Sequence, residues 1–136
     1  MKAILVAGLL SIVPSLALAE GCAPEGGTTV AKVESMNQLM LDLDIAGFVA
    51  AIKTEIGIDL GTSLDGLSSI YGEGFTGCAT IAQRSDLGGM VQNVVMFDAK
   101  VGPLFTYWLA VPQDGGHRVI SFTLDTELEK VMAKLR

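Results

Sequence analysis

The sequence predicts a single α+β domain: N-terminal helices packed on a curved four-stranded antiparallel meander, with a short C-terminal helix. Three observations carry this prediction. Apolar residues recur at three- and four-residue steps between residues 28 and 56, which is helical periodicity. Four runs rich in β-branched and aromatic residues follow, with short turn segments between them. Thr126 and Glu129 then form the capping box that opens a last helix.

The first 19 residues are predicted to be a cleavable secretory signal peptide. Lys2 supplies a short positive segment, and residues 3–13 form an apolar core of signal-peptide length. Ala17 and Ala19 put small residues at positions −3 and −1, so cleavage is expected before Glu20. A permanent anchor is the rival interpretation, but an apolar stretch of about 17 residues lies at the lower limit for spanning a bilayer. We therefore expect a periplasmic or secreted mature domain, residues 20–136, without a membrane span.

The charge balance of the chain is acidic. Nine Lys and Arg residues stand against 15 Asp and Glu residues, a formal net charge of −6. Loss of Lys2 with the signal peptide leaves eight against 15, a net charge of −7. No basic stripe is present to neutralise phosphates, which disfavours nucleic acid or an anionic membrane as a partner. A small apolar ligand or a protein partner is the remaining expectation.

Two cysteines, Cys22 and Cys78, remain after cleavage. In an oxidising compartment an even count predicts one disulfide, here one that closes a loop of about 57 residues. Such a loop would stabilise the fold by roughly 4 kcal/mol in the chain-entropy treatment and would pin the irregular lead-in of residues 20–27. Redox-active pairs usually stand close together, as in Cys-x-x-Cys, so a structural role is favoured. A lipid on Cys22 is the less favoured alternative, because Glu20 poorly matches the residues that precede lipidated cysteines.

Two apolar-periodic pieces make up the helical part. The first begins near Thr28, and the second covers residues 45–56 and stops at Gly57. The polar stretch of residues 42–47 leaves open whether these are two helices or one. The glycine-rich segment 57–77 has no Gly-x-Gly-x-x-Gly following a strand and no Gly-x-x-x-x-Gly-Lys, so no phosphate-binding loop is expected there. No cofactor is predicted.

The four strand-like runs are residues 78–83, 90–97, 104–111 and 118–124. Short segments rich in Gly, Asp and Pro separate them. Connections this short join antiparallel neighbours, so the four strands are expected to form a meander.

The third strand is apolar on both of its faces. Alternation places Phe105, Tyr107 and Leu109 on one face, with Leu104, Thr106 and Trp108 on the other. Both faces of the sheet are therefore expected to be covered. The helices would cover one face, and a ligand or a second subunit would cover the other, which makes a homodimer through the sheet one candidate arrangement. In a simpler alternative, Trp108 only covers the rim of the core.

The order of elements, together with the segment His117-Arg118-Val119-Ile120-Ser121-Phe122-Thr123, resembles the nuclear-transport-factor-two-like superfamily. Members often have a basic residue, a valine, a hydrophobic residue and an aromatic residue in a short last strand. The resemblance implies a cone-shaped α+β fold with a pocket between the helices and the concave sheet. The superfamily contains enzymes, binding modules and scaffolds, so the fold does not by itself indicate an activity.

A pocket of that kind would be lined by the second helix and the third strand. Phe48, Val49 and Ile52 recur at helical spacing, and we expect them to point inward at Phe105 and Tyr107. The ligand entering it would be small and apolar.

Asp98, Tyr107 and Asp125 are the candidate catalytic residues. Ketosteroid isomerases of the same superfamily set a carboxylate base against a tyrosine and a protonated aspartate in an apolar site. Asp98 and Asp125 also have ordinary structural roles, at a strand end and at a helix start. His117, the only histidine, follows two glycines and is expected in an exposed turn. One histidine does not make a ligand set, so no metal site is expected.

The leading functional hypothesis is a non-enzymatic exported protein that binds a small apolar ligand or a protein partner. Its basis is that no nucleophile–base pair, metal set or cofactor loop is visible in the sequence. The alternative is a small cofactor-free isomerase or dehydratase that works in an apolar cone-shaped pocket. The position of Tyr107 relative to the two aspartates distinguishes the two hypotheses.

Overall fold

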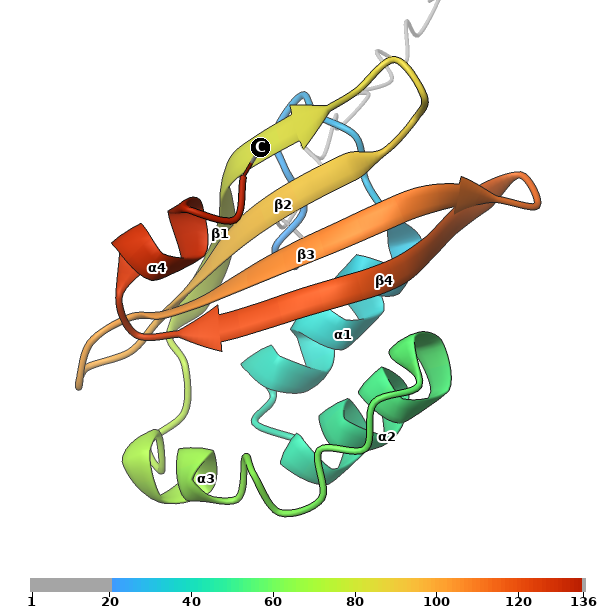
Figure 1. The fold of residues 1–136 in the computed structure, drawn as a ribbon. Coiled ribbons are helices and arrows are strands. Elements are labelled where there is room, and N and C mark those ends of the chain that lie inside the picture. The colour runs from blue at the N-terminus through green and yellow to red at the C-terminus, as the bar shows by residue number, and fades with distance from the viewer. Residues whose placement is uncertain (1–20, 136) are drawn as a thin grey trace, which may run out of the picture.

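A computed structural model describes residues 21–135 of the chain, so the predicted signal peptide, residues 1–19, lies outside the described residues (Figure 1). The fold is α+β, as predicted, with helices before and after a four-stranded sheet. The elements in chain order are α1 (Ala31–Leu41), α2 (Ile45–Ile56), α3 (Gly66–Ile70), β1 (Gly77–Ser85), β2 (Val91–Asp98), β3 (Leu104–Gln113), β4 (Gly116–Asp125) and α4 (Leu128–Met132).

The strands form the predicted antiparallel meander in the order β1-β2-β3-β4. Tight turns make this order possible. Asp114 and Gly115, between β3 and β4, have φ angles of 49° and 77°. Two successive positive φ angles are the signature of the type I′ turn that suits a two-residue hairpin. The sheet therefore has two edge strands, β1 and β4.

The helical region contains two helices, which answers the question that the sequence left open. Leu43 has a φ of 56°, in the left-handed region, so the chain turns sharply after α1. Asp44 then caps α2, because its Oδ1 accepts a hydrogen bond from the backbone N–H of Gly47 at 2.9 Å. Gly57, with a φ of 81°, ends α2 in the conformation typical of a glycine C-cap.

The inner face of the sheet, which we define as the face toward α1 and α2, carries the main core. Trp108 on β3 is fully buried, and its ring lies 6.0 Å from that of Phe48 on α2 and 5.6 Å from that of Phe122 on β4. The Trp108 Nε1–H donates to Oδ1 of the buried Asn37 on α1 at 2.9 Å, so the polar end of the indole is satisfied. Val95 on β2 is fully buried in the same cluster.

The outer face of the sheet is partly covered by α4, which lies on the opposite side from α1 and α2 (Figure 1). Val131 of α4 is fully buried against Val94, Phe105 and Tyr107. Phe105 and Tyr107 thus share a face, and Trp108 occupies the other, as alternation predicted. Both faces of β3 are covered within one chain.

Candidate binding groove along strand β1

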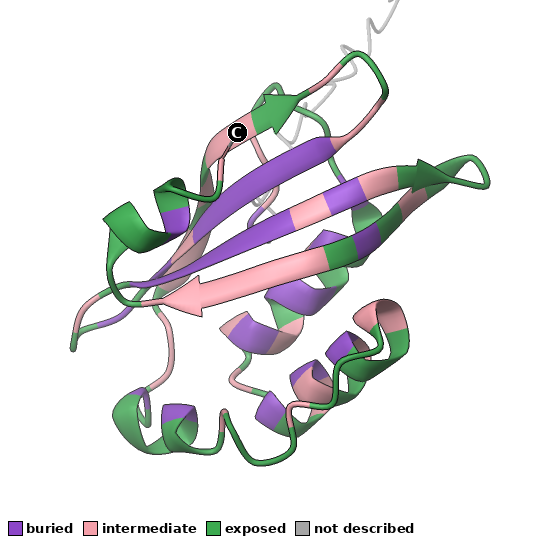
Figure 2. Cartoon of the chain, in the orientation of Figure 1, coloured by how far each residue is buried: buried purple, intermediate pink, exposed green. Residues whose placement is uncertain are grey.

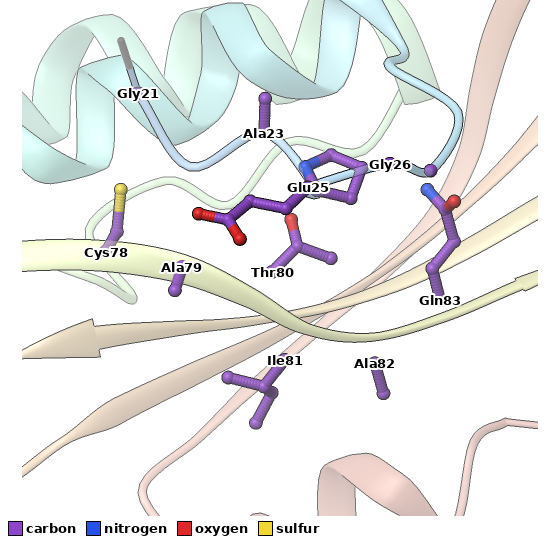
Figure 3. Close-up of a pocket in the computed structure, with 12 residues that line it drawn as sticks. Gly21, Ala23, Glu25, Gly26, Cys78, Ala79, Thr80, Ile81, Ala82 and Gln83 are labelled. Atoms are coloured by element: carbon purple, nitrogen blue, oxygen red, sulfur yellow. The ribbon is translucent and has the colours of Figure 1, made fainter. Parts of the chain in front are cut away.

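An open groove of about 790 Å³ runs along β1, between this edge strand and the lead-in of residues 21–27 (Figure 3). Its lining consists of twelve residues: Gly21, residues 23–27 and residues 78–83. Burial distinguishes β1 from its neighbour β2. Most of β2 is buried, whereas β1 is half-buried or exposed along its length (Figure 2).

Two clamps hold the lead-in against β1, one at each end of the groove. At one end Cys22 and Cys78 form the predicted disulfide, with their Cα atoms 5.0 Å apart, and the Thr80 hydroxyl donates to the carbonyl of Cys22. At the other end Gln83 exchanges two hydrogen bonds with the backbone of Thr28, at 2.7 and 2.8 Å. Between the clamps the lead-in arches over the strand.

The Gln83 clamp requires a glycine in the lead-in. A Cβ atom added to Gly27 would lie 2.4 Å from the Gln83 side-chain oxygen, closer than any real contact. The Gln83 amide is not free to move away, because it also donates to Asn93 Oδ1 on β2 at 2.7 Å. The close approach of the lead-in to β1 therefore depends on the missing side chain at this position.

Glu25 is the only charged residue among the twelve that line the groove. Figure 3 shows its side chain lying between the lead-in and β1. Most of the other lining residues are glycine, alanine or proline, so the groove walls are largely main chain and small side chains. The groove therefore offers a partner mainly backbone polar groups, a modest apolar surface and one negative charge.

A β-bulge lies in the middle of the groove. The register between β1 and β2 shifts between Thr80 and Ala82, so Ile81 is the extra residue of the strand. Ile81 is 41% exposed. Strand β4, the other edge, has a comparable bulge at Ile120, which is also 41% exposed. The two edges therefore differ mainly in the lead-in that arches over β1.

Glu34 of α1 lies beneath the start of the lead-in. Its Oε2 is 3.6 Å from the position that a Cβ of Gly21 would occupy. Both carboxylate oxygens are shielded from solvent, and neither accepts a hydrogen bond of normal geometry from the described residues. Burial raises the pKa of Glu34 above its ordinary value of 4.5, and the nearby backbone N–H of Cys22 and the Asn37 amide only partly oppose the rise.

Stability should therefore depend on the protonation of Glu34. A carboxyl group with a raised folded-state pKa stabilises the fold below its unfolded pKa, and this contribution is lost as the pH rises through the folded pKa. We expect Glu34→Gln to leave stability unchanged near pH 4 and to raise it near pH 8. The gain should be at most about 1 kcal/mol, because the Cys22 backbone N–H and the Asn37 amide offset part of the cost of burying the charge.

Urea unfolding of both proteins at the two pH values measures this difference. Glu129→Gln, at an exposed acid of α4, is the matched control and should show no pH-dependent gain. A Glu34→Gln variant that is less stable than the wild type at the higher pH would contradict the assignment.

The predicted apolar pocket is not formed, because its residues lie on opposite faces of the sheet. Phe48 and Ile52 are fully buried in the inner-face cluster with Trp108. Phe105 and Tyr107 belong to the outer-face cluster under α4. The prediction that they face the helix of residues 45–56 is wrong, since the inner face of β3 is filled by the larger indole. Val49 instead lines a separate open cleft on α2.

The three candidate catalytic residues are not brought together as an acid–base site. The Tyr107 hydroxyl donates to Oε1 of the buried Gln92 at 2.9 Å. Asp125 lies opposite Phe105 at the end of β4, and its Oδ1 accepts a hydrogen bond from the backbone N–H of Glu127. Asp98 is exposed at the end of β2. The three residues are absent from the lining of the main surface clefts of residues 21–135.

His117 is half-buried rather than in an exposed turn. Its Nε2 lies 3.1 Å from the carbonyl of Gly89, so it connects the β3–β4 hairpin to the β1–β2 turn. Residues 21–135 contain no group of three or more His, Cys, Asp or Glu side chains placed to hold a metal ion. Within the same range, no helix combines the length and apolar character needed to cross a membrane.

Comparison of the chain with protein-family models, curated proteins and solved structures found no significant match. The assignment of a function therefore rests on the site itself. Sequence patterns missed Glu25, Ile81 and Gln83 as groove residues, because nothing local marks β1 as the edge beside which the lead-in folds back.

Proposed function

We propose that the chain is an exported, non-enzymatic protein-binding module that engages its partner through the groove along β1. The observation that carries the proposal is an open groove between a sheet edge, to which no strand of residues 21–135 is paired, and a lead-in clamped at both ends. Unpaired edges template the addition of other chains, and proteins usually protect them. Here the lead-in borders the edge and leaves room beside it.

A protein partner fits this groove better than a small apolar ligand does. Ligand pockets are usually enclosed and lined mainly by hydrophobic and aromatic side chains. The groove is open, and its lining is main chain, small residues and Glu25. The isomerase hypothesis has no support of this kind, since Tyr107 donates to Gln92 and Asp125 is occupied by a backbone N–H.

Export is part of the proposal, supported by the signal-peptide pattern of residues 1–19. The Cys22–Cys78 disulfide is compatible with an oxidising compartment outside the cytosol. The mature protein is expected to begin at Glu20.

Site-specific photo-cross-linking tests the proposal. Ile81 is replaced by p-benzoyl-phenylalanine in the cells that make the protein natively, and the cells are irradiated before fractionation. The expected result is a discrete protein adduct in the exported fraction, with the cross-linked chain starting at Glu20 by mass spectrometry. Ile120, the equally exposed bulge residue of β4, is the matched control position and should give no such adduct.

Two outcomes would count against the proposal. Equal adducts at positions 81 and 120 would indicate unspecific contact with both sheet edges. A chain that keeps residues 1–19, or that stays in the cytosol, would remove export from the proposal.

A further inference from the structure

We propose that the partner contributes an extended segment that adds to β1 as a fifth strand and places a lysine or arginine side chain beside Glu25. This inference rests on the proposed function and names its partner by chemistry: a cationic peptide in β conformation. Three features of the groove lead to it. They are the outward backbone groups of β1, which pair with no other strand of residues 21–135, the small side chains around them, and the carboxylate of Glu25.

The hairpin between β1 and β2 shows which backbone groups face outward. The Asp86 N–H donates to the carbonyl of Met90, and the Gly89 N–H donates to the carbonyl of Asp86, each at 2.9 Å. Backbone bonding alternates along an antiparallel ladder, so residue 84 bonds to β2, while residues 83 and 85 direct their N–H and C=O groups away from it. The outward groups of Gln83 lie at the groove, where an added strand would pair with them.

The side chains leave room for the residues of an added strand. Alternate residues of such a strand would point toward the lead-in, and the others toward the outer face beside Ala79 and Ala82. Gly26 and Gly27 on one wall and these alanines on the other supply little bulk of their own. The six strand residues that border the groove correspond to about 20 Å of extended chain, enough for a short peptide to make several ladder bonds.

The charge of the groove selects the occupant. Glu25 lies in it without a positive residue among the other lining residues. A second copy of this chain, paired through β1, would bring together two mature molecules, each of formal net charge −7, and two Glu25 side chains. Like charges set close together at an interface disfavour that pairing. A basic segment has the complementary charge.

A synthetic peptide tests both the addition of a strand to β1 and the charge contact with Glu25. The probe is acetylated and amidated Thr-Val-Thr-Lys-Thr-Val-Thr, and its twin has glutamate in place of lysine. Hydrogen exchange followed by NMR should show slowed exchange at the Gln83 and Ser85 amides when the lysine peptide is added. Fluorescence anisotropy should show about tenfold tighter binding of the lysine peptide than of its twin, as expected when an attractive charge contact becomes a repulsive one.

Matched charge variants isolate the role of Glu25. Glu25→Lys should abolish the preference for the lysine peptide or reverse it. Glu129→Lys changes the net charge of the protein equally but lies on α4, and it should keep the preference. Both side chains are exposed, so both variants should fold.

The outcomes separate this inference from the proposed function. If cross-linking at position 81 succeeds but neither peptide slows exchange at Gln83 at millimolar concentration, strand addition is overturned and the binding role stands. A lysine preference that persists in Glu25→Lys overturns the charge assignment. A third outcome is slower exchange of the Gln83 amide as the protein concentration alone is raised, with a dimer observed in sedimentation. That result identifies a second copy of the chain as the occupant and overturns the inference.

Discussion

Replacing Phe48 by alanine is expected to destabilise the protein by about 3–5 kcal/mol, the usual cost of deleting a large buried aromatic side chain. Phe48 is fully buried on α2, with ring contacts to Trp108 at 6.0 Å and to Phe122 at 5.9 Å. Trp108 and Phe122 lie opposite each other on the paired strands β3 and β4, and this pairing limits how far their rings can move into the space left behind. Urea unfolding, followed by circular dichroism, measures the change in the free energy of unfolding.

The matched control for this substitution is Leu87→Ala. Leu87 lies in the β1–β2 turn and is fully exposed, so its loss should change stability by no more than about 0.5 kcal/mol. A cost below about 1 kcal/mol for Phe48→Ala would contradict the packing of α2 on the inner face of the sheet.

Removal of the disulfide should have the second large effect. The Cys22–Cys78 bond joins residues 56 positions apart, and a double alanine variant is expected to lose about 2–5 kcal/mol. The loss arises mainly because the unfolded chain regains the freedom that the cross-link removes. The lead-in should also loosen at its Cys22 end, while the Gln83–Thr28 hydrogen bonds still hold the other end.

Two measurements check this expectation. Unfolding of the wild type with and without dithiothreitol should reproduce most of the difference between the wild type and the double variant, because both comparisons remove the cross-link. Hydrogen exchange should speed up most at the amides of residues 22, 23 and 25, which open locally, and at the buried Trp108 indole only as far as the loss of global stability dictates. An unchanged unfolding midpoint under reduction would show that the bond does not contribute to stability.

Local patterns in the sequence determined the elements and their internal faces. The apolar spacing of residues 45–56 predicted α2, and turn residues between β-rich runs predicted the meander. Alternation along β3 correctly separated Phe105 and Tyr107 from Trp108. The pairing of the cysteines also followed from the sequence, because an even count of two permits only one intramolecular bond.

Only the tertiary structure decided which face of the sheet each helix covers. Periodicity shows that Phe48 and Ile52 share one face of α2, and that Phe105 and Tyr107 share one face of β3. It does not show that these two faces meet, because that depends on contacts between segments far apart in the chain. In the structure, the fully buried Trp108 packs against α2 on the inner face, and α4 covers Phe105 and Tyr107 on the outer face.

The groove was likewise decided by the tertiary structure. Gln83 and Glu25 are 58 residues apart in the chain, with α1, α2 and α3 between them. Their proximity comes from the disulfide and from the hydrogen bonds between Gln83 and Thr28. A local pattern identifies β1 as a strand but not as the edge of the sheet, since strand order arises from pairing along the whole meander. Residues at a sheet edge can be identified only when the strand order is known, because that order decides which strand lacks a neighbour on one side.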